Sequence, residues 1–277
     1  FAYICINYRI KANTIEAAAA FLSLGIDPQR STFWVQSDIK DVLELYWILS
    51  QLTPMGLVER AHAYKDKVAK GLEAHHGLFS YPVLMAADIL LFNAQKVPVG
   101  KDQIQHVEIA RDLALKFNNA YGEIFTLPQA QVAQNVATVP GTDGAKMSKS
   151  YKNTIDIFSD AKTLKKQCSS IVTNSTPLEE PKDWQNCNIY AIAKLFLNEQ
   201  EQANLQDRYS KGGEGYGHFK MYLNELTWNY FAPAREKFQY YMNNQNEIID
   251  ILHNGAKKAK KTSDEIMAKV RDAVGIY

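Results

Sequence analysis

The chain has 277 residues, of which 46% are hydrophobic and 22% charged, with 31 basic and 30 acidic side chains. This composition is typical of a soluble globular protein and excludes a disordered tail, a fibre and a small disulfide-rich domain. The balanced charge excludes nucleic-acid binding through bulk positive charge, so any RNA contact has to use local patches. The length predicts one large domain and a smaller one.

The cysteine spacing and the hydropathy of the chain indicate in which cellular compartment the protein works. Cys5, Cys168 and Cys187 are widely spaced and form no C-x-x-C pair, which argues against both a disulfide framework and a zinc site. We therefore expect a cytoplasmic protein without a metal site of its own. The longest apolar stretch, residues 79–92, contains Asp88 and falls short of the ~20 residues that cross a bilayer, so it predicts a buried helix and no membrane anchor.

The first half of the chain alternates short β-branched or aromatic runs with helical periods. This pattern predicts βαβ units, and hence a mainly parallel sheet covered by helices. The predicted strands are residues 1–6, 32–36 and 96–99. The predicted helices are residues 12–24, 38–51, 55–70 with a break near Tyr64, 80–92 and 102–118. No methionine starts the sequence, so we expect the true N-terminus to lie upstream of Phe1.

A polar loop with two glycines, residues 141–153, follows the alternating region. Helical periods then fill the rest of the chain, at residues 160–172, 188–197, 199–209, 218–242, 247–253 and 256–274. We therefore predict an α/β domain over residues 1–154 and an all-α domain over residues 155–277.

Asp88 is the only charged residue of the apolar helix predicted at residues 80–92. Tyr81, Met85 and Asp88 share one face, because they recur at i, i+4 and i+7. A carboxylate in apolar surroundings needs a partner, which an N–H group of a ligand would supply. A structural salt bridge or a cap on a neighbouring segment would satisfy it equally well.

Two further segments carry groups suited to a nucleotide. Gly100 ends a predicted strand and Asp102 begins a helix, which is where open α/β sheets bind ligands; alternatively, Asp102 only caps the helix. Lys146 and Lys149 lie in a loop beside hydroxyl groups, where they could follow charge on phosphoryl oxygens. Lys65 and Lys67 could reach a pyrophosphate, or form an ordinary solvated helix end.

The sequence Lys-Met-Ser-Lys-Ser at residues 146–150 is identical to the KMSKS motif of class I aminoacyl-tRNA synthetases. Residues 81–90, 97–103, 106–112 and 213–220 resemble the tryptophanyl-tRNA synthetase family, and the similarity extends over essentially the whole chain. Tyrosyl-tRNA synthetases share the fold but typically differ in the lysine loop and around the substrate aspartate. The resemblance implies a Rossmann-like catalytic domain with a helical tRNA- and anticodon-binding domain.

The resemblance also implies roles for individual residues. Asp88 would accept a hydrogen bond from the indole N–H of tryptophan, which would disfavour a phenylalanine-like ring. The remaining pocket wall would consist of Tyr81, Met85, Val97, Val99 and Gln103. The ATP site would consist of Gly100, Lys101 and Asp102 at the ribose, Val139 at the adenine, Lys146, Met147, Ser148, Lys149 and Ser150 at the phosphates, and Lys65 and Lys67 near the pyrophosphate.

The implied reaction is the activation of tryptophan by ATP carrying Mg²⁺, followed by transfer to tRNA(Trp) by a homodimer. The family's other ATP motif, HIGH, does not occur in these 277 residues, and we expect that residues near Arg9 or before Phe1 are missing. The alternatives are a non-catalytic relative that binds tryptophan or RNA, and a tyrosyl-tRNA synthetase.

Overall fold

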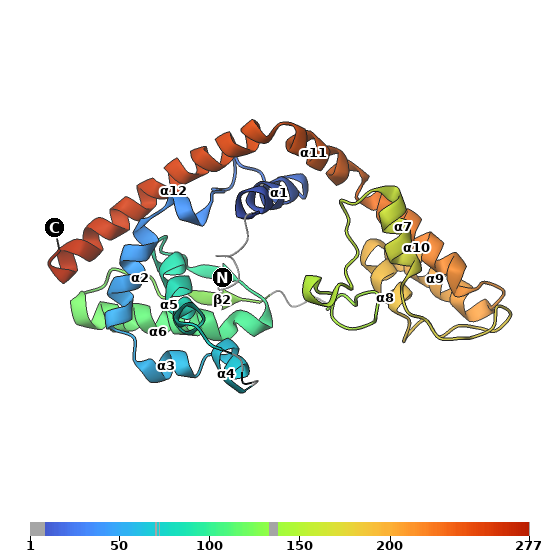
Figure 1. Cartoon of the computed structure of the whole chain (residues 1–277), viewed down its shortest axis with the longest axis horizontal. Helices are drawn as coiled ribbons and strands as arrows, with labels where there is room; N and C mark the ends of the chain where they lie inside the picture. The colour runs from blue at the N-terminus through green and yellow to red at the C-terminus, as the bar shows by residue number, and fades with distance from the viewer. Residues whose placement is uncertain (1–8, 70, 72, 133–137, 277) are drawn as a thin grey trace. The chain divides into compact units, whose positions relative to one another are not determined.

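The computed structural model describes residues 9–69, 71, 73–132 and 138–276, which form two compact units (Figure 1). Unit 1 contains the described residues up to 132 together with those from Asn244 onward, and unit 2 contains those from 138 to Asn243. This division differs from the predicted boundary after residue 154. The loop at residues 141–153 belongs to unit 2, and the last helix packs into the core of unit 1.

Unit 1 combines helices with a short parallel sheet. Its helices are α1 (Ile10–Ser23), α2 (Asp41–Gln51), α3 (Met55–Glu59), α4 (His62–Ala69), α5 (His76–Leu90), α6 (Ile104–Tyr121) and α12 (Gln245–Val274), with 3-10 turns η2 (Gln36–Asp38) and η3 (Lys101–Gln103). Strand β1 (Lys96–Pro98) pairs in parallel with β2 (Gln129–Gln131), Val97 facing Ala130. The predicted α/β architecture is confirmed.

The strand predictions have different outcomes. The strand predicted at residues 96–99 is confirmed, and the Val99 N–H continues the pairing by donating to the Gln131 carbonyl at 3.1 Å. The prediction for residues 32–36 is wrong: residues 32–35 have no strand assignment, and Gln36 starts η2. The prediction for residues 1–6 lies outside the described residues. The sequence pattern also missed β2, which is too short and polar to show a strand period.

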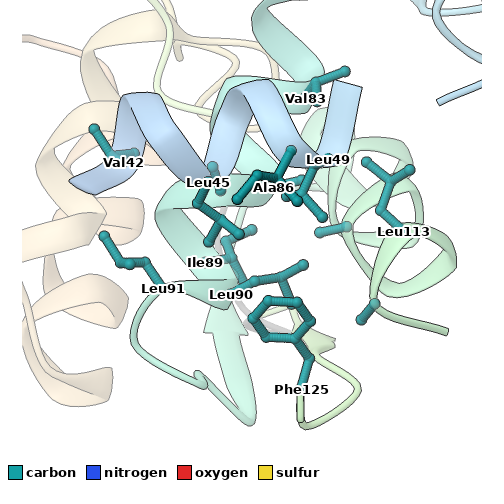
Figure 2. Packing of buried hydrophobic residues seen from close by; sticks show 14 of the residues in the cluster. Val42, Leu45, Leu49, Val83, Ala86, Ile89, Leu90, Leu91, Leu113 and Phe125 are labelled. Carbon is teal, nitrogen blue, oxygen red and sulfur yellow. The ribbon is translucent and has the colours of Figure 1, made fainter. Parts of the chain in front are cut away.

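The core of unit 1 lies where α2, α5 and α6 pack together (Figure 2). Leu45 and Leu49 are one helical turn apart on α2 and are fully buried against Leu90 of α5 and Leu113 of α6. Phe125 closes the same cluster. Truncating one such leucine to alanine typically costs about 2–5 kcal/mol, so this core fixes the helix that carries Asp88.

Helix α12 is one continuous helix of 30 residues, whereas the sequence pattern predicted two helices with a break before Ala256. Gly255 lies between the two predicted helices, and glycine is a weak helix former. The helix continues because its apolar face is buried: Ile266, Met267 and Val270 belong to the core of unit 1.

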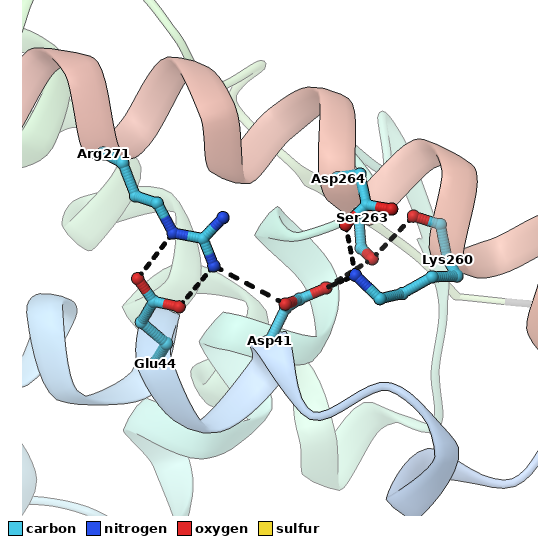
Figure 3. Close-up of polar contacts among 6 residues, drawn as sticks. All are labelled: Asp41, Glu44, Lys260, Ser263, Asp264 and Arg271. Carbon is cyan, nitrogen blue, oxygen red and sulfur yellow. Dashed lines mark hydrogen bonds and ion pairs between the residues drawn. The ribbon is translucent and has the colours of Figure 1, made fainter. Parts of the chain in front are cut away.

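A polar network joins α12 to α2 (Figure 3). Asp41 accepts hydrogen bonds from Ser263 at 2.8 Å and from the Lys260 ammonium at 3.0 Å. The Arg271 Nε donates to Glu44 Oε1 at 2.8 Å, and a second guanidinium nitrogen bonds to the other oxygen. The network therefore fixes the C-terminal helix α12 on helix α2 of unit 1 at two points.

We expect this network to make unit 1 sensitive to acid. Burial alone would raise the pKa of Asp41, but hydrogen bonds from Ser263 and Lys260 hold it below its ordinary value, and the hydrogen bond from Arg271 lowers the pKa of Glu44. A lowered carboxyl pKa stabilises the fold above the unfolded-state pKa, and this contribution disappears as the pH falls through the folded-state pKa, below about 4. Asp41→Asn should cost about 1 kcal/mol at pH 7, because solvent screens the exposed part of the network.

Urea unfolding followed by helical circular dichroism at several pH values tests this expectation. The difference between wild type and Asp41→Asn should shrink as the pH falls below about 4 and through the lowered folded-state pKa of Asp41, because the carboxylate that the network stabilises is then protonated. A difference that is unchanged with pH would show that the Asp41 charge does not stabilise the fold.

Unit 2 is built around α10 (Tyr216–Tyr230). Its other elements are η4 (Lys149–Tyr151), α7 (Ala161–Ser169), α8 (Asn188–Ala193), η5 (Lys194–Phe196), α9 (Glu199–Lys211) and α11 (Ala232–Asn243). Tyr209 stacks on Phe219 with ring centroids 3.8 Å apart at the centre of its core. The helix predicted at residues 218–242 is divided between α10 and α11, next to Pro233, whose ring cannot continue a helix from the preceding turn.

In the part of the chain that the structure describes, no helix has the length and apolar character needed to traverse a bilayer.

Candidate functional site

A cavity of about 300 Å³ lies in unit 1, beside the extended segment at residues 32–35. Its volume is at the lower end of the roughly 300–1,000 Å³ typical of small-molecule sites. The walls are largely aromatic and aliphatic, and three polar residues, Thr32, Gln36 and Asp88, also line the cavity. The lining includes Phe33, Trp34, Leu91 and Phe92, together with the polar residues Gln36 and Asp88.

Asp88 lies on α5 and is partly buried in this cavity. The Gln36 Nε2 donates to Asp88 Oδ2 at 2.6 Å. Burial raises the pKa of Asp88, and the hydrogen bond from Gln36 offsets part of that effect. Among the described residues no cation pairs with Asp88, so the structural salt bridge considered above is not what satisfies it. A carboxylate has about four acceptor positions, which leaves capacity for a donor from a ligand.

The remaining residues of the predicted pocket do not line this cavity. The Tyr81 hydroxyl is hydrogen-bonded to His106 Nε2 at 2.6 Å, and Met85 and Val97 pack against the core. Val99 continues the pairing of β1, and Gln103 donates to Asp102 at 3.0 Å. Of the predicted pocket residues, Asp88 is the one that lines the cavity, so the roles of the others stay predictions.

Sequence reasoning missed the residues that complete this cavity. Gln36 and Trp34 fell in a segment interpreted as a strand, and nothing local links Gln36 to Asp88, which is 52 positions away. The one pattern in this segment was the alternation of apolar and polar residues at 32–36, which indicated a buried strand and not a ligand site.

Helix α12 packs against the segment that carries Phe33 and Trp34 of the cavity wall. The Gly255 backbone lies so close to Phe33 that a Cβ on Gly255 would overlap the Phe33 carbonyl. Trp34, the next residue, packs edge-to-face on Phe92 with ring centroids 4.9 Å apart. The C-terminal helix therefore fixes the position of a segment more than 200 residues away in sequence.

The predicted ribose-binding segment follows β1 directly. Gly100 precedes η3, which contains the exposed residues Lys101 and Asp102, and α6 begins at Ile104. Neither Gly100 nor Gln103, the residues before η3 and α6, makes a side-chain cap. The Asp102 carboxylate is thus at the end of a parallel strand, as a nucleotide site at the sheet edge requires.

The lysine-containing loop lies in unit 2 and is an ordered turn. Pro140 and Lys146 form an antiparallel bridge, and the Met147 N–H donates to the Val139 carbonyl at 3.0 Å. Ser148 accepts a hydrogen bond from the Ser150 N–H at 3.3 Å and thereby caps η4. The side chain of Val139 packs against the core of unit 2.

Lys146, Lys149 and Ser150 are exposed on this turn. Within the described residues neither lysine forms an ion pair, so both ammonium groups are available to an anion. Lys65 is exposed on α4, and the side chain of Lys67 lies outside the described residues. The described residues contain no cluster of three or more His, Cys, Asp or Glu side chains that could hold a metal ion.

Comparison with known proteins gives a consistent result. Residues 7–232 match the family model of class I tRNA synthetases for tryptophan and tyrosine. The chain is 69% identical to the tryptophan–tRNA ligase of Campylobacter jejuni over 268 residues, covering 97% of this chain and 84% of the relative. It is 49% identical to that of Fusobacterium nucleatum, covering 96% and 82%.

Solved structures agree with the sequence comparison. A crystal structure of the Campylobacter jejuni tryptophanyl-tRNA synthetase complexed with ADP and tryptophan superposes with a TM-score of 0.92, at 69% identity, over 97% of this chain and 84% of the other.

Proposed function

The chain belongs to the class I tRNA synthetases for tryptophan and tyrosine, and from this membership we infer that it activates tryptophan with ATP and transfers it to tRNA. The observation that carries the inference is the 69% identity to a tryptophan–tRNA ligase over 97% of the chain. Asp88 in an aromatic cavity and the exposed lysines of residues 146–150 supply chemistry suited to that reaction.

The reaction has two steps. A tryptophan carboxylate oxygen attacks the α-phosphorus of ATP, the bond to the β-phosphate breaks, and pyrophosphate leaves with that electron pair. A hydroxyl of the terminal tRNA ribose then attacks the activated carbonyl and releases AMP. Both steps depend on positioning and charge stabilisation more than on a strong base.

The amino acid is bound in the cavity at Asp88. Its aromatic walls, Phe33, Trp34 and Phe92, accept the indole ring, and the Asp88 carboxylate accepts the indole N–H. Gln36 orients the carboxylate by occupying Oδ2. A ring without an N–H would leave a buried acceptor unpaired, which disfavours phenylalanine.

ATP is bound at two places. The loop at residues 146–150 supplies two ammonium groups to the phosphates, and Gly100, Lys101 and Asp102 at the end of β1 contact the ribose. Val139 contacts the adenine, and Lys65 and Lys67 lie near the pyrophosphate. Mg²⁺ arrives bound to ATP. The enzyme acts on tRNA(Trp) as a cytoplasmic homodimer, with the helices of unit 2 contributing to tRNA binding.

Gly255→Ala tests the cavity wall. The added methyl group overlaps the Phe33 carbonyl and should displace the wall, weakening tryptophan binding by roughly tenfold, in line with the ~1–3 kcal/mol typical of overpacking. ATP affinity should change less than twofold. Tryptophan and ATP titrations by calorimetry measure both.

Two variants serve as controls for Gly255→Ala. Gly77→Ala makes the same substitution on α5, where the new Cβ meets nothing within 4 Å. Met267→Ala destabilises α12 without touching the cavity. If Met267→Ala weakened tryptophan binding as much as Gly255→Ala did, the effect would come from lost stability and not from the wall.

The proposed function is tested by charging. Protein expressed from the full coding sequence is incubated with ATP, unfractionated tRNA and labelled tryptophan or tyrosine. We expect label in acid-precipitable tRNA with tryptophan alone. Labelling with tyrosine alone would show that the chain charges tRNA with tyrosine, the other amino acid that its family activates.

A further inference from the structure

Asn153 follows the lysine motif by three residues and is almost completely buried, with 2% of its surface exposed. An asparagine is rarely buried unless its amide is fully used. Here the amide faces the inside of the turn that presents Lys146 and Lys149.

The Asn153 side chain bonds to three points of that turn. Its Nδ2 donates to Asp143 Oδ1 at 2.7 Å and to the Lys146 carbonyl at 3.1 Å. Its Oδ1 accepts from the Ser148 N–H at 2.7 Å. The hydrogen bond from Asn153 is the largest cause that lowers the pKa of Asp143.

The backbone around Asn153 completes the arrangement. The Thr142 N–H donates to the Asn153 carbonyl at 2.9 Å. A Cβ on Gly141 would overlap the Asn153 amide, so the glycine leaves the space that the asparagine fills. One side chain therefore ties the turn before the motif to the motif's first and third residues.

We propose that Asn153 is a positioning residue for ATP, which fixes the backbone of residues 146–148 so that the lysines meet the phosphates in one geometry. The proposal rests on the phosphate-binding role proposed for this loop. The amide is needed because it donates twice and accepts once at this position. A carboxylate of the same shape would lose both donors and would lie beside the Asp143 carboxylate.

The test compares Asn153→Asp with wild type in tryptophan-dependent exchange of pyrophosphate into ATP. We expect kcat/KM for ATP to fall by roughly 10–100-fold, while the Kd for tryptophan, measured by direct titration, changes less than twofold. If the side chain were needed only for folding, the substitution would weaken tryptophan binding as well as lower kcat/KM for ATP, and the active fraction of the protein would fall.

The control variant Asn186→Asp breaks a similar Asn–Asp hydrogen bond, from Asn186 Nδ2 to Asp183 Oδ2 at 2.7 Å, at an exposed site of the same unit. It should leave kinetics unchanged. In the double variant Asn153→Asp with Asp143→Asn, the amide is at position 143 and can donate to the carboxylate at position 153. This restores one of the two lost hydrogen bonds, so the double variant should recover part of the lost kcat/KM. If Asn153→Asp does not fold, Gly141→Ala, which displaces the amide from the other side, should show the same selective loss.

Wild-type kinetics for ATP in a folded Asn153→Asp variant, or equal losses of ATP and tryptophan binding, would overturn the proposal. Absence of exchange in the wild-type protein would instead contradict the proposed function, so the two failures are distinguishable.

Discussion

Asp88→Ala is expected to weaken tryptophan binding by about 10–100-fold, since a hydrogen bond to a charged group contributes about 1.5–3 kcal/mol. The substitution removes the proposed acceptor for the indole N–H and also leaves the Gln36 amide without its partner in the cavity. ATP affinity should change less than twofold, because Asp88 lies in the cavity proposed for the amino acid. Calorimetric titration with each ligand separates the two effects.

Asp88→Asn provides an intermediate case. It keeps an oxygen that accepts a hydrogen bond but removes the charge, so the loss of affinity should be smaller than that of Asp88→Ala. Asp112→Ala, at an exposed position on α6, should bind tryptophan like wild type. Equal losses of tryptophan and ATP affinity in Asp88→Ala would mean that Asp88 supports the fold rather than the ligand.

Lys146→Ala and Lys149→Ala should each reduce the rate of adenylate formation by about 10²-fold or more, the magnitude typical of removing one group that stabilises transition-state charge. Both ammonium groups are exposed on an ordered turn and have no ion-pair partner among the described residues, so their charge is available to phosphate oxygens. Tryptophan affinity in the absence of ATP should be unchanged. Single-turnover formation of the adenylate measures the chemical step directly.

Lys162→Ala is the matched control, since Lys162 is also exposed and lies on α7 of the same unit. Its rate should equal that of wild type. Lys149→Arg keeps the charge and should retain more activity than Lys149→Ala. Rates for Lys146→Ala and Lys149→Ala within twofold of wild type would exclude the loop from the reaction.

Local patterns in the sequence predicted those features that depend on local contacts. The helix containing Asp88, the strand at residues 96–98 and the exposed lysine turn were identifiable because periodicity, turn residues and a contiguous motif lie within a few positions. The family resemblance then supplied their chemistry.

Features that depend on contacts between distant residues were missed. Gln36 meets Asp88 across 52 positions, and Ser263 meets Asp41 across 222, so no local pattern marks either pair. Helix α12 was predicted as two helices with Gly255 between them, whereas the structure requires glycine at this position of one helix because the backbone of Phe33 approaches it closely. Packing between distant segments, not propensity, determined these features.

Activation of tryptophan is tested most directly by exchange of labelled pyrophosphate into ATP by protein expressed from the full coding sequence, with tryptophan, tyrosine or no amino acid. We expect exchange that depends on tryptophan, is absent with tyrosine, and is reduced in Asp88→Ala through a higher KM for tryptophan. Tryptophan binding without any exchange would contradict this expectation, because the chain would then hold the amino acid without activating it.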